Sequence, residues 1–351
     1  MRSSCGRQPF PWREDEIFGR FGRGFAEGRT ACPFRGNVGT RNGFLFGKKA
    51  WSEAALSDRN GFTSGYRFQD LQSFLDLYEE GAGVLREQED FHQLALAYMD
   101  RIAREGVWHV EPFFDPQIHT ARGVEICDVV EGVLSGLREG EKKHGISWRL
   151  IPSFLRHLTE ADAMRTFQEL LPYRKHFAAV GLDSSEKGNP PGKFERVFAQ
   201  VREAGLKVVA HAGEEGPATY IREAIEKLKA VRIDHGVRCM EDPDLVKELA
   251  QKRIPLTVCP LSNIKLCVFK KLSEHPLKEL LHAGMNVTIN SDDPAFFGGL
   301  LETWLACLKE LSLGETDLAQ LAKNSFTGSF LSDEEKMKWI QKIDRLVGVS
   351  A

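Results

Sequence analysis

The sequence has no apolar run that approaches the roughly 18 residues of a membrane-spanning helix, so no membrane segment is expected. It also has no pair of cysteines in C-x-x-C spacing, and its 7 cysteines are an odd number, unlike a disulfide framework. No apolar segment typical of a signal peptide opens the chain. We therefore expect a cytoplasmic protein, or a nuclear one in a eukaryote, in which most cysteines pack as small apolar residues.

An excess of either charge is also lacking. The 351 residues include 47 Lys+Arg and 50 Asp+Glu, a net charge of -3, and 42% of them are hydrophobic. This balance is typical of a globular protein and excludes general disorder or a basic surface spread over the whole chain. The expected partner is a small molecule, with no nucleic acid and no membrane, and the composition predicts no oligomeric state.

Branched aliphatic residues are scarce in one part of the chain. Residues 1–50 contain a single Leu, a single Ile and a single Val but nine glycines, and 10 Lys+Arg against 4 Asp+Glu. Such a stretch can hardly bury a strand or an amphipathic helix. We therefore divide the chain into an atypical Gly- and Arg-rich segment, residues 1–65, predicted to be poorly ordered or mistranslated, and a folded domain, residues 66–351.

From about residue 66 onward, short apolar runs alternate with longer amphipathic ones. Val, Ile and Phe dominate several of the short runs, as in strands buried on both faces of a parallel sheet. We predict seven strands, at residues 107–114, 149–155, 178–182, 206–210, 231–233, 254–259 and 285–289. Helices are predicted between them at residues 124–143, 160–171, 194–204, 220–228 and 245–251. This order, with no Pro/Gly/Ser-rich linker, indicates one α/β domain.

Two α/β architectures compete for this pattern. A closed (β/α)8 barrel needs eight strands, whereas an open doubly wound sheet can use seven. Polar or charged side chains follow nearly every predicted strand, among them Arg156, Glu186, His211, His235 and Asp292. A barrel gathers the residues after many different strands at one face, whereas a doubly wound sheet gathers them at one switch point. The pattern favours a (β/α)8 TIM barrel whose first strand is missing or replaced.

Two predicted strands end in motifs that suit metal and proton chemistry. His211 follows an apolar strand and Glu214 comes three residues later; a histidine in this place can bind zinc, and a carboxylate can move protons. Asp292 and Asp293 follow another strand, and adjacent carboxylates need a cation or a shared proton to relieve their repulsion. Each motif also has an ordinary explanation, a hydrogen-bonded loop histidine in the first case and a turn or helix cap in the second.

Two further motifs lie between these in the chain. His235 ends a predicted strand in Arg-Ile-Asp-His-Gly, where a lone histidine is usually a structural residue. Cys259 begins Cys-Pro-Leu-Ser-Asn. Because a proline follows it and no base is evident, we expect this cysteine to pack in the core rather than act as a nucleophile.

Taken together and in this order, four motifs resemble the adenosine/adenine deaminase family of metal-dependent hydrolases: HAGEEGP, RIDHG, VCPLSN and NSDDPAFFGG. Three further stretches resemble the adenine deaminase branch of this family: HVEPFFDPQIHT from His109, SFLRH from Ser153 and GLDSSEKGNPP from Gly181. The similarity runs from about Tyr66 to near Leu331. It implies a (β/α)8-barrel hydrolase that uses one zinc ion to convert adenine to hypoxanthine with release of ammonia, a reaction of purine salvage.

The resemblance also implies a role for each matching residue. His211 and Asp292 would bind zinc, and His235 would orient and deprotonate the attacking water. Glu214, held protonated, would donate a proton to purine N1, and Asp293 would share a hydrogen bond at N7.

Substrate choice is expected to depend on the segment that begins Asp-Ser-Ser-Glu. Ser184 and Glu186 lie where this family distinguishes free adenine from adenosine. A carboxylate there would hydrogen-bond the N9 or N3 edge of a free base and crowd out a ribose. The resemblance therefore favours adenine, with adenosine as the alternative substrate.

One part of the family pattern is missing. The family's first strand ends in H-x-H-L-(D/E)-G, which supplies two further zinc ligands, but this sequence has no histidine before His92. Three interpretations are open: a coding sequence misread upstream of about Tyr66, a catalytically impaired pseudoenzyme or purine-binding protein on the same fold, and an altered zinc site with water or cysteine ligands. Because His211 and Asp292 alone cannot close a zinc site, we predict weak retention of zinc.

Overall fold

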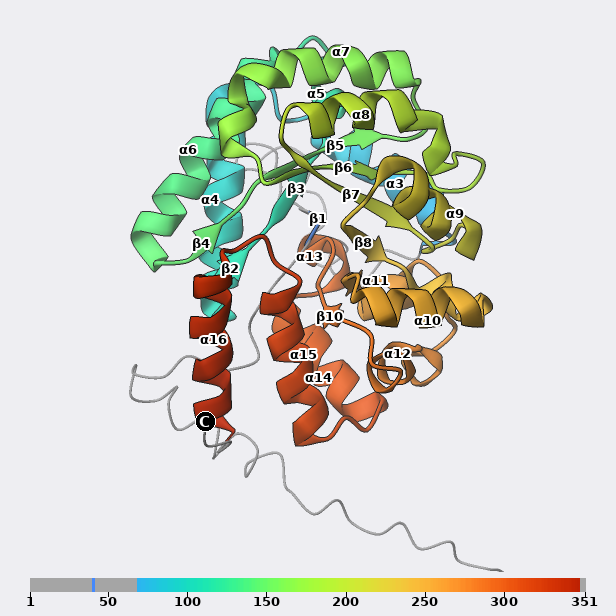
Figure 1. Cartoon of the computed structure of the whole chain (residues 1–351). Helices are drawn as coiled ribbons and strands as arrows, with labels where there is room; N and C mark the ends of the chain where they lie inside the picture. The colour runs from blue at the N-terminus through green and yellow to red at the C-terminus, as the bar shows by residue number, and fades with distance from the viewer. Residues whose placement is uncertain (1–39, 42–67, 348–351) are drawn as a thin grey trace, which may run out of the picture.

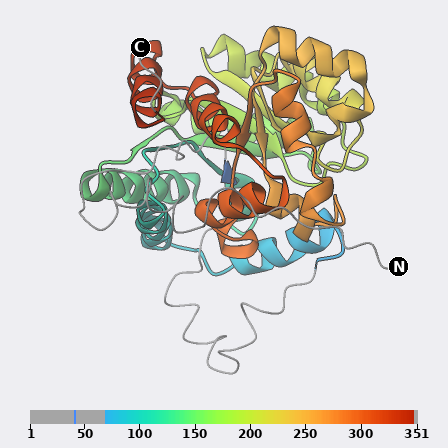
Figure 2. The ribbon, with the colours of Figure 1, turned by 90° about the horizontal axis from the view of Figure 1, so that it is seen from below.

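The chain forms a parallel β-sheet surrounded by helices (Figures 1 and 2). The computed structural model describes residues 40–41 and 68–347, so the predicted atypical segment, residues 1–65, lies outside the described residues except for Thr40–Arg41. The sheet consists of β1 (Thr40–Arg41), β3 (Pro112–Phe114), β5 (Ile151–Leu155), β6 (Ala179–Asp183), β7 (Lys207–Ala212), β8 (Arg232–His235), β9 (Leu256–Val258) and β10 (Val287–Ile289). A separate pair joins β2 (His109–Val110) and β4 (Ser147–Trp148).

Six of the seven strands predicted from the apolar runs are confirmed as single strands, and the first, residues 107–114, is divided at Glu111 into β2 and β3. The strands lie side by side in chain order, β1-β3-β5-β6-β7-β8-β9-β10, and each recorded pair is parallel. Because this order contains no reversal, the described strands have no switch point of the doubly wound kind. β1 takes the edge beside β3, with Thr40 opposite Pro112. Within the described residues, no backbone pairing joins β1 to β10.

Helices connect successive strands and cover the outside of the sheet (Figure 1). The α-helices are α3 (Leu71–Ala82), α4 (Gln88–Arg104), α5 (Pro116–Thr120), α6 (Ile126–His144), α7 (Glu160–Leu170), α8 (Glu195–Glu203), α9 (Ala218–Glu223), α10 (Pro243–Lys252), α11 (Pro260–Lys265), α12 (Leu277–His282), α13 (Pro294–Phe297), α14 (Leu300–Glu310), α15 (Glu315–Thr327) and α16 (Asp333–Leu346). Shorter helical turns are η1 (Leu171–His176), η2 (Pro191–Phe194), η3 (Ala224–Leu228), η4 (Val237–Glu241) and η5 (Leu272–Glu274). The five predicted helices are confirmed, and none of the helices in residues 68–347 is long and apolar enough to cross a membrane.

Local sequence explains where several helices begin. The side chains of Asp70, Thr159 and Ser332 accept the backbone N–H three residues later and so cap α3, α7 and α16. Asp242 caps α10, and Pro243 takes the first helical position, where its missing N–H costs nothing. These caps fix the residues at which the four helices begin.

α3 packs over the residues that follow β10. Phe74 of α3 contacts Phe296 and Phe297 of α13, with ring centroids 5.3 and 4.8 Å apart, and Phe68 lies edge-on to Phe74 at 5.3 Å. All four rings are buried. Such offset aromatic pairs stabilise beyond their buried area, so this cluster holds α3 against the loop that carries Asp292 and Asp293.

A buried ion pair joins strands on opposite parts of the sheet. The guanidinium of Arg232 in β8 donates to the carboxylate of Glu111, between β2 and β3, and both side chains are 0% exposed. Burial alone would raise the pKa of Glu111, but Arg232, His109 and the backbone N–H of Phe330 lower it to about 2. Glu111 is therefore ionised throughout the neutral range and depends on these partners.

Candidate active site

The residues singled out in the sequence lie at the carboxyl ends of β7, β8, β9 and β10. His211 belongs to β7, His235 is the last residue of β8, Cys259 directly follows β9, and Asp292 lies three residues beyond β10. Each is at most 4% exposed. Parallel strands in sequential order bring their carboxyl ends to one edge, so residues that are far apart in the chain form one buried group.

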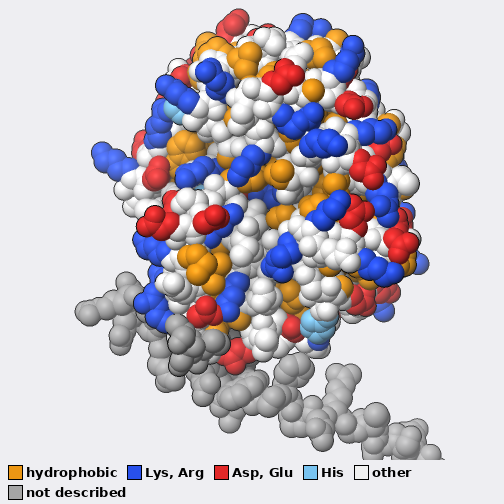
Figure 3. All heavy atoms as spheres, viewed as in Figure 1, with side chains coloured by type: hydrophobic (Ala, Val, Ile, Leu, Met, Phe, Trp, Pro, Cys, Tyr) orange, Lys and Arg blue, Asp and Glu red, His pale blue; other side chains and the backbone are white. Residues whose placement is uncertain are grey.

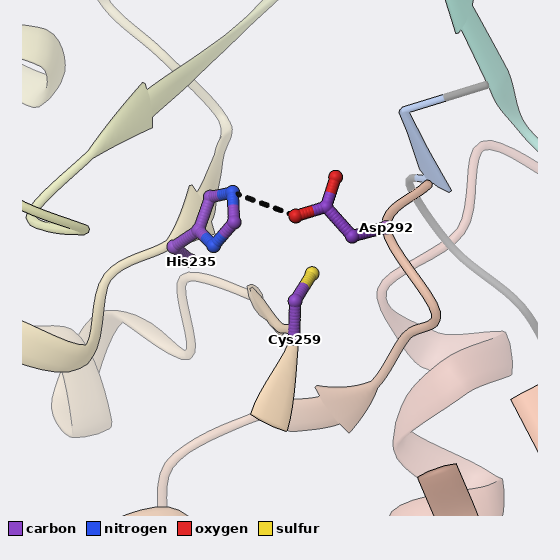
Figure 4. Close-up of side chains that lie close together, drawn as sticks. All are labelled: His235, Cys259 and Asp292. Carbon is purple, nitrogen blue, oxygen red and sulfur yellow. Dashed lines mark ion pairs between the residues drawn. The ribbon is translucent and has the colours of Figure 1, made fainter. Parts of the chain in front are cut away.

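Three of these side chains point toward one another. One ligand atom each from His235, Cys259 and Asp292 lie within 4.8 Å of one another (Figure 4). His235 Nε2 is 3.8 Å from Asp292 Oδ2. Nitrogen, sulfur and oxygen donors in a buried group are a set that zinc accepts. The sequence had indicated a packing role for Cys259, and its signal as a possible ligand was its position immediately after a strand.

Glu214 and His235 face each other in the same site. Glu214 is 2% exposed and its Oε2 lies 3.5 Å from His235 Nε2. Asn263 of α11 approaches the other ring nitrogen, with Nδ2 at 3.5 Å from His235 Nδ1, and Asn263 Oδ1 lies 3.1 Å from His275 Nε2. Burial lowers the pKa of His275 to about 3, with His235 adding to the effect. His275 is therefore neutral and, through Asn263, fixes the His235 ring so that Nε2 faces the carboxylates.

His211 is positioned by two neighbours that the sequence had not marked for this role. Its ring centroid lies 5.0 Å from that of His235, and its Nδ1 is 3.6 Å from Asp234 Oδ2. Arg156 donates to the His211 carbonyl at 2.6 Å. Burial raises the pKa of Asp234 to about 6, although Arg232 and Thr257 oppose the rise. A carboxylate beside one imidazole nitrogen orients the ring and leaves the other nitrogen for a metal; the signal for Asp234 was its place beside His235.

Three of the predicted site residues have strained backbone. Ser184, His235 and Asp292 have φ values of 77°, 63° and 58°, in the left-handed region that residues other than glycine rarely adopt. Such strain gathers at functional sites, where surrounding contacts hold it in place. It therefore marks the ends of β6, β8 and the turn after β10 as parts of one functional region.

The carboxylate of Glu186 accepts hydrogen bonds from the backbone of the loop that carries Glu214. Its Oε1 accepts the backbone N–H of Gly213 at 2.6 Å, and its Oε2 accepts those of Glu214, Glu215 and Gly216 at 3.0, 2.9 and 2.7 Å. Glu186 is 1% exposed. Four backbone donors on one carboxylate fix the course of this loop. The contact of Glu186 with a purine stays a prediction, since these bonds neither require nor exclude it.

The remaining predicted residues also lie in this region. Ser184 Oγ is 2.9 Å from His157 Nδ1, and Ser184 is 3% exposed. Asp293 is 0% exposed and stands at the N-cap of α13, with Pro294 in the first helical position. The helix-cap explanation therefore describes the position of Asp293, but its side chain makes no capping hydrogen bond, and a substrate contact of the carboxylate stays a prediction.

We expect Glu186→Gln to disturb catalysis through the Glu214 loop. The side-chain amide nitrogen of the glutamine cannot accept hydrogen bonds, so the backbone N–H groups that faced one carboxylate oxygen lose their acceptor and the loop shifts. A misplacement of about 1 Å costs about 10²-fold in kcat. Ammonia release from adenine, the reaction that the resemblance implies, measures kcat; a KM that changes little would show that Glu186 acts on the loop rather than on the purine.

Glu160→Gln is the matched control. The Glu160 carboxylate accepts the backbone N–H of Arg196 and Val197 at the start of α8. Both variants should lose about 1–3 kcal/mol of unfolding free energy, but only Glu186→Gln should lose kcat. Equal kcat in the two variants would contradict a positioning role for Glu186.

On the face of the molecule drawn in Figure 3, Lys and Arg are interspersed with Asp and Glu, so neither charge dominates.

Five cysteines in the described part of the chain are free thiols: Cys127, Cys239, Cys259, Cys267 and Cys307.

Comparison with known proteins places the chain among deaminases. A family model described as adenosine deaminase matches residues 52–346. The adenine deaminase of Geotalea uraniireducens is 54% identical over 283 residues, 80% of each chain, and that of Hahella chejuensis is 52% identical over 283 residues, 80% of this chain and 85% of its own.

Solved structures agree with the sequence comparison. The adenine deaminase of Arthrobacter aurescens superposes with a TM-score of 0.82 at 43% identity, covering 89% of this chain and 98% of its own. An amidohydrolase from Burkhoderia ambifaria, solved with bound zinc, shares the fold with a TM-score of 0.81 at 23% identity and covers 90% of this chain and 92% of its own. By the extent of the matching residues and by the identity to its relatives, the chain belongs to the adenosine deaminase family.

Proposed function

We propose that this protein is a zinc-dependent adenine deaminase that hydrolyses adenine to hypoxanthine and ammonia. The observation that carries the proposal is the buried group of Glu214, His235 and Asp292 at the carboxyl ends of the strands. Its relatives of 50–54% identity that bear the name adenine deaminase support the choice of substrate.

The described residues include some of the ligands that a zinc site needs. His211 and Asp292 would hold the zinc ion, and Asp234 beside His211 Nδ1 leaves the other ring nitrogen to coordinate. When bound, zinc acts as a Lewis acid that makes water nucleophilic at neutral pH. The described residues contain no H-x-H pair, so the two further ligands of the family pattern are not among them.

The protein's own side chains supply the proton transfers in this proposal. His235 would accept a proton from the attacking water through Nε2, the ring nitrogen that faces Glu214 and Asp292. Glu214, buried 3.5 Å from that nitrogen, donates a proton to purine N1 as water adds to C6. Asp293 shares a hydrogen bond at N7. His235 then gives its proton to the amino group, the C6–N bond breaks as ammonia leaves, and the remaining proton of the C6 hydroxyl passes to Glu214, which restores its acid form.

We further propose that the strands close as a (β/α)8 barrel with β1 in the place of the first strand. The pairing of β1 with β3 and the likeness to the Arthrobacter aurescens enzyme support this arrangement. Residues 66–351 would form the barrel domain together with β1, and the rest of residues 1–65 would be the atypical segment. The free cysteines are consistent with a cytoplasmic setting.

An assay of the full chain with supplied zinc tests the proposal. Adenine and adenosine are compared by ammonia release, and we expect faster turnover of adenine because, by the resemblance, Ser184 and Glu186 would stand where adenosine carries its ribose. Faster turnover of adenosine would overturn the substrate assignment.

A second candidate function follows from the absence of histidine before His92. A chain with two zinc ligands would bind a purine without turning it over. Equilibrium binding of adenine with no ammonia release at any zinc concentration would favour this catalytically impaired protein over the enzyme.

A further inference from the structure

Cys259 lies in the site although the proposed reaction gives it no role. It is 3% exposed, and its Sγ has a weak contact to the Thr257 carbonyl at 3.5 Å. Figure 4 shows the sulfur directed toward His235 and Asp292, the residues with which it forms a group of potential ligands within 4.8 Å. Three strand ends, those of β8, β9 and β10, thus converge on one point.

The three donors are close enough to share one ion. Zinc bonds of about 2.0–2.3 Å place tetrahedral ligand atoms roughly 3.3–3.8 Å apart, so the side chains need to approach one another by about an ångström. The surroundings also favour a cation, because the carboxylates of Glu214 and Asp292 both lie within 3.8 Å of His235 Nε2. Two carboxyl groups that converge on one buried nitrogen cannot both be ionised unless a shared proton or a cation compensates their charge.

We propose that His235, Cys259 and Asp292 form a thiolate-containing site for a soft divalent metal such as zinc or cadmium, distinct from the arrangement of His211 and Asp292 that serves catalysis. Binding breaks the Cys259 S–H bond, forms a metal–sulfur bond and releases the thiol proton to solvent. Thiolate sulfur selects soft ions over magnesium or calcium.

Occupancy of this site has a consequence for activity, which rests on the proposed function. A His235 nitrogen that coordinates a metal cannot accept a proton from water, and Asp292 cannot serve both arrangements at once. Excess soft metal therefore inhibits the deaminase. The proposed site also has three ligands, so it retains zinc on dialysis better than His211 and Asp292 alone.

Cobalt titration of the full chain tests the site without an activity assay. Co²⁺ replaces zinc and gives a near-ultraviolet charge-transfer band only when a thiolate is a ligand. We expect this band in the wild type and its loss in Cys259→Ser. Cys307→Ser, which changes another buried cysteine, in α14, should keep the band. Absence of the band in the wild type, or its persistence in Cys259→Ser, would overturn the proposal.

Inhibition by cadmium separates this proposal from the proposed function. We expect cadmium to inhibit ammonia release at least tenfold less effectively in Cys259→Ser than in Cys307→Ser. Equal inhibition of the two variants contradicts an inhibitory role of the site. If no variant releases ammonia under any condition, the proposed function fails, whereas the cobalt band still decides whether Cys259 is a ligand.

Discussion

Replacement of Glu214 by Gln is expected to lower kcat for adenine by about 10²–10⁴-fold, the usual contribution of a general acid. The change keeps the shape of a side chain that is 2% exposed and lies 3.5 Å from His235, but the amide cannot donate the proton to the purine ring. KM should change much less than kcat, because the substrate contacts remain. Ammonia release under saturating adenine measures the effect.

Glu215→Gln provides the control for this experiment. Glu215 is the next residue in the chain, but its carboxylate accepts the backbone N–H of Leu71 and pairs with Lys187 at 3.2 Å. It therefore belongs to the contact with α3 rather than to the group around His235. We expect less than a tenfold change in kcat. Similar losses in both variants would show that Glu214 is not the proton donor.

Replacement of Arg232 by Met is expected to reduce the free energy of unfolding by about 3–5 kcal/mol, because it leaves the buried Glu111 carboxylate without its guanidinium partner. Both side chains are 0% exposed, so water cannot replace the lost partner. Urea unfolding at neutral pH measures the loss. Lys247→Met, which breaks the exposed pair with Asp244, should leave stability almost unchanged.

The double variant Arg232→Met/Glu111→Leu keeps this prediction measurable if the single variant does not fold. Removing both charges should restore part of the lost stability, since no charge is left buried alone. The pH dependence has a defined sign: because Glu111 has a folded pKa of about 2, its ionised form stabilises the fold fully above its unfolded pKa of about 4.3. That stabilisation is lost as the pH falls toward 2, and the double variant should lack this part of the acid sensitivity.

The fold was predictable from local patterns because hydrophobic periodicity is a property of neighbouring residues. The seven apolar runs correspond to β2/β3, β5, β6, β7, β8, β9 and β10 within a few residues. β1 was not predictable in this way, because Thr40–Arg41 lies in a segment with almost no branched aliphatic residues. Its strand pairing depends on the neighbouring β3, which supplies the hydrogen-bonding edge.

The sequence predicted some residues of the candidate site but not the contacts among them. His211, Glu214, His235 and Asp292 could be chosen because each follows a strand in a motif of a known family. The contacts of Glu186 could not be chosen, because its four backbone donors lie 27–30 residues further along the chain. A carboxylate that looked like a substrate contact in the sequence is bonded to the loop of the proposed acid in the structure.

The sequence by itself determined the alternation of strands and helices, the capping of several helices and the family motifs, all of which depend on residues near one another in the chain. Only the tertiary structure decided that Cys259 faces His235 and Asp292, that Asp234 orients His211, and that Arg232 pairs with Glu111 across 121 positions. The physical reason is that these contacts depend on strand order and register, which bring residues that are far apart in the chain side by side in the sheet.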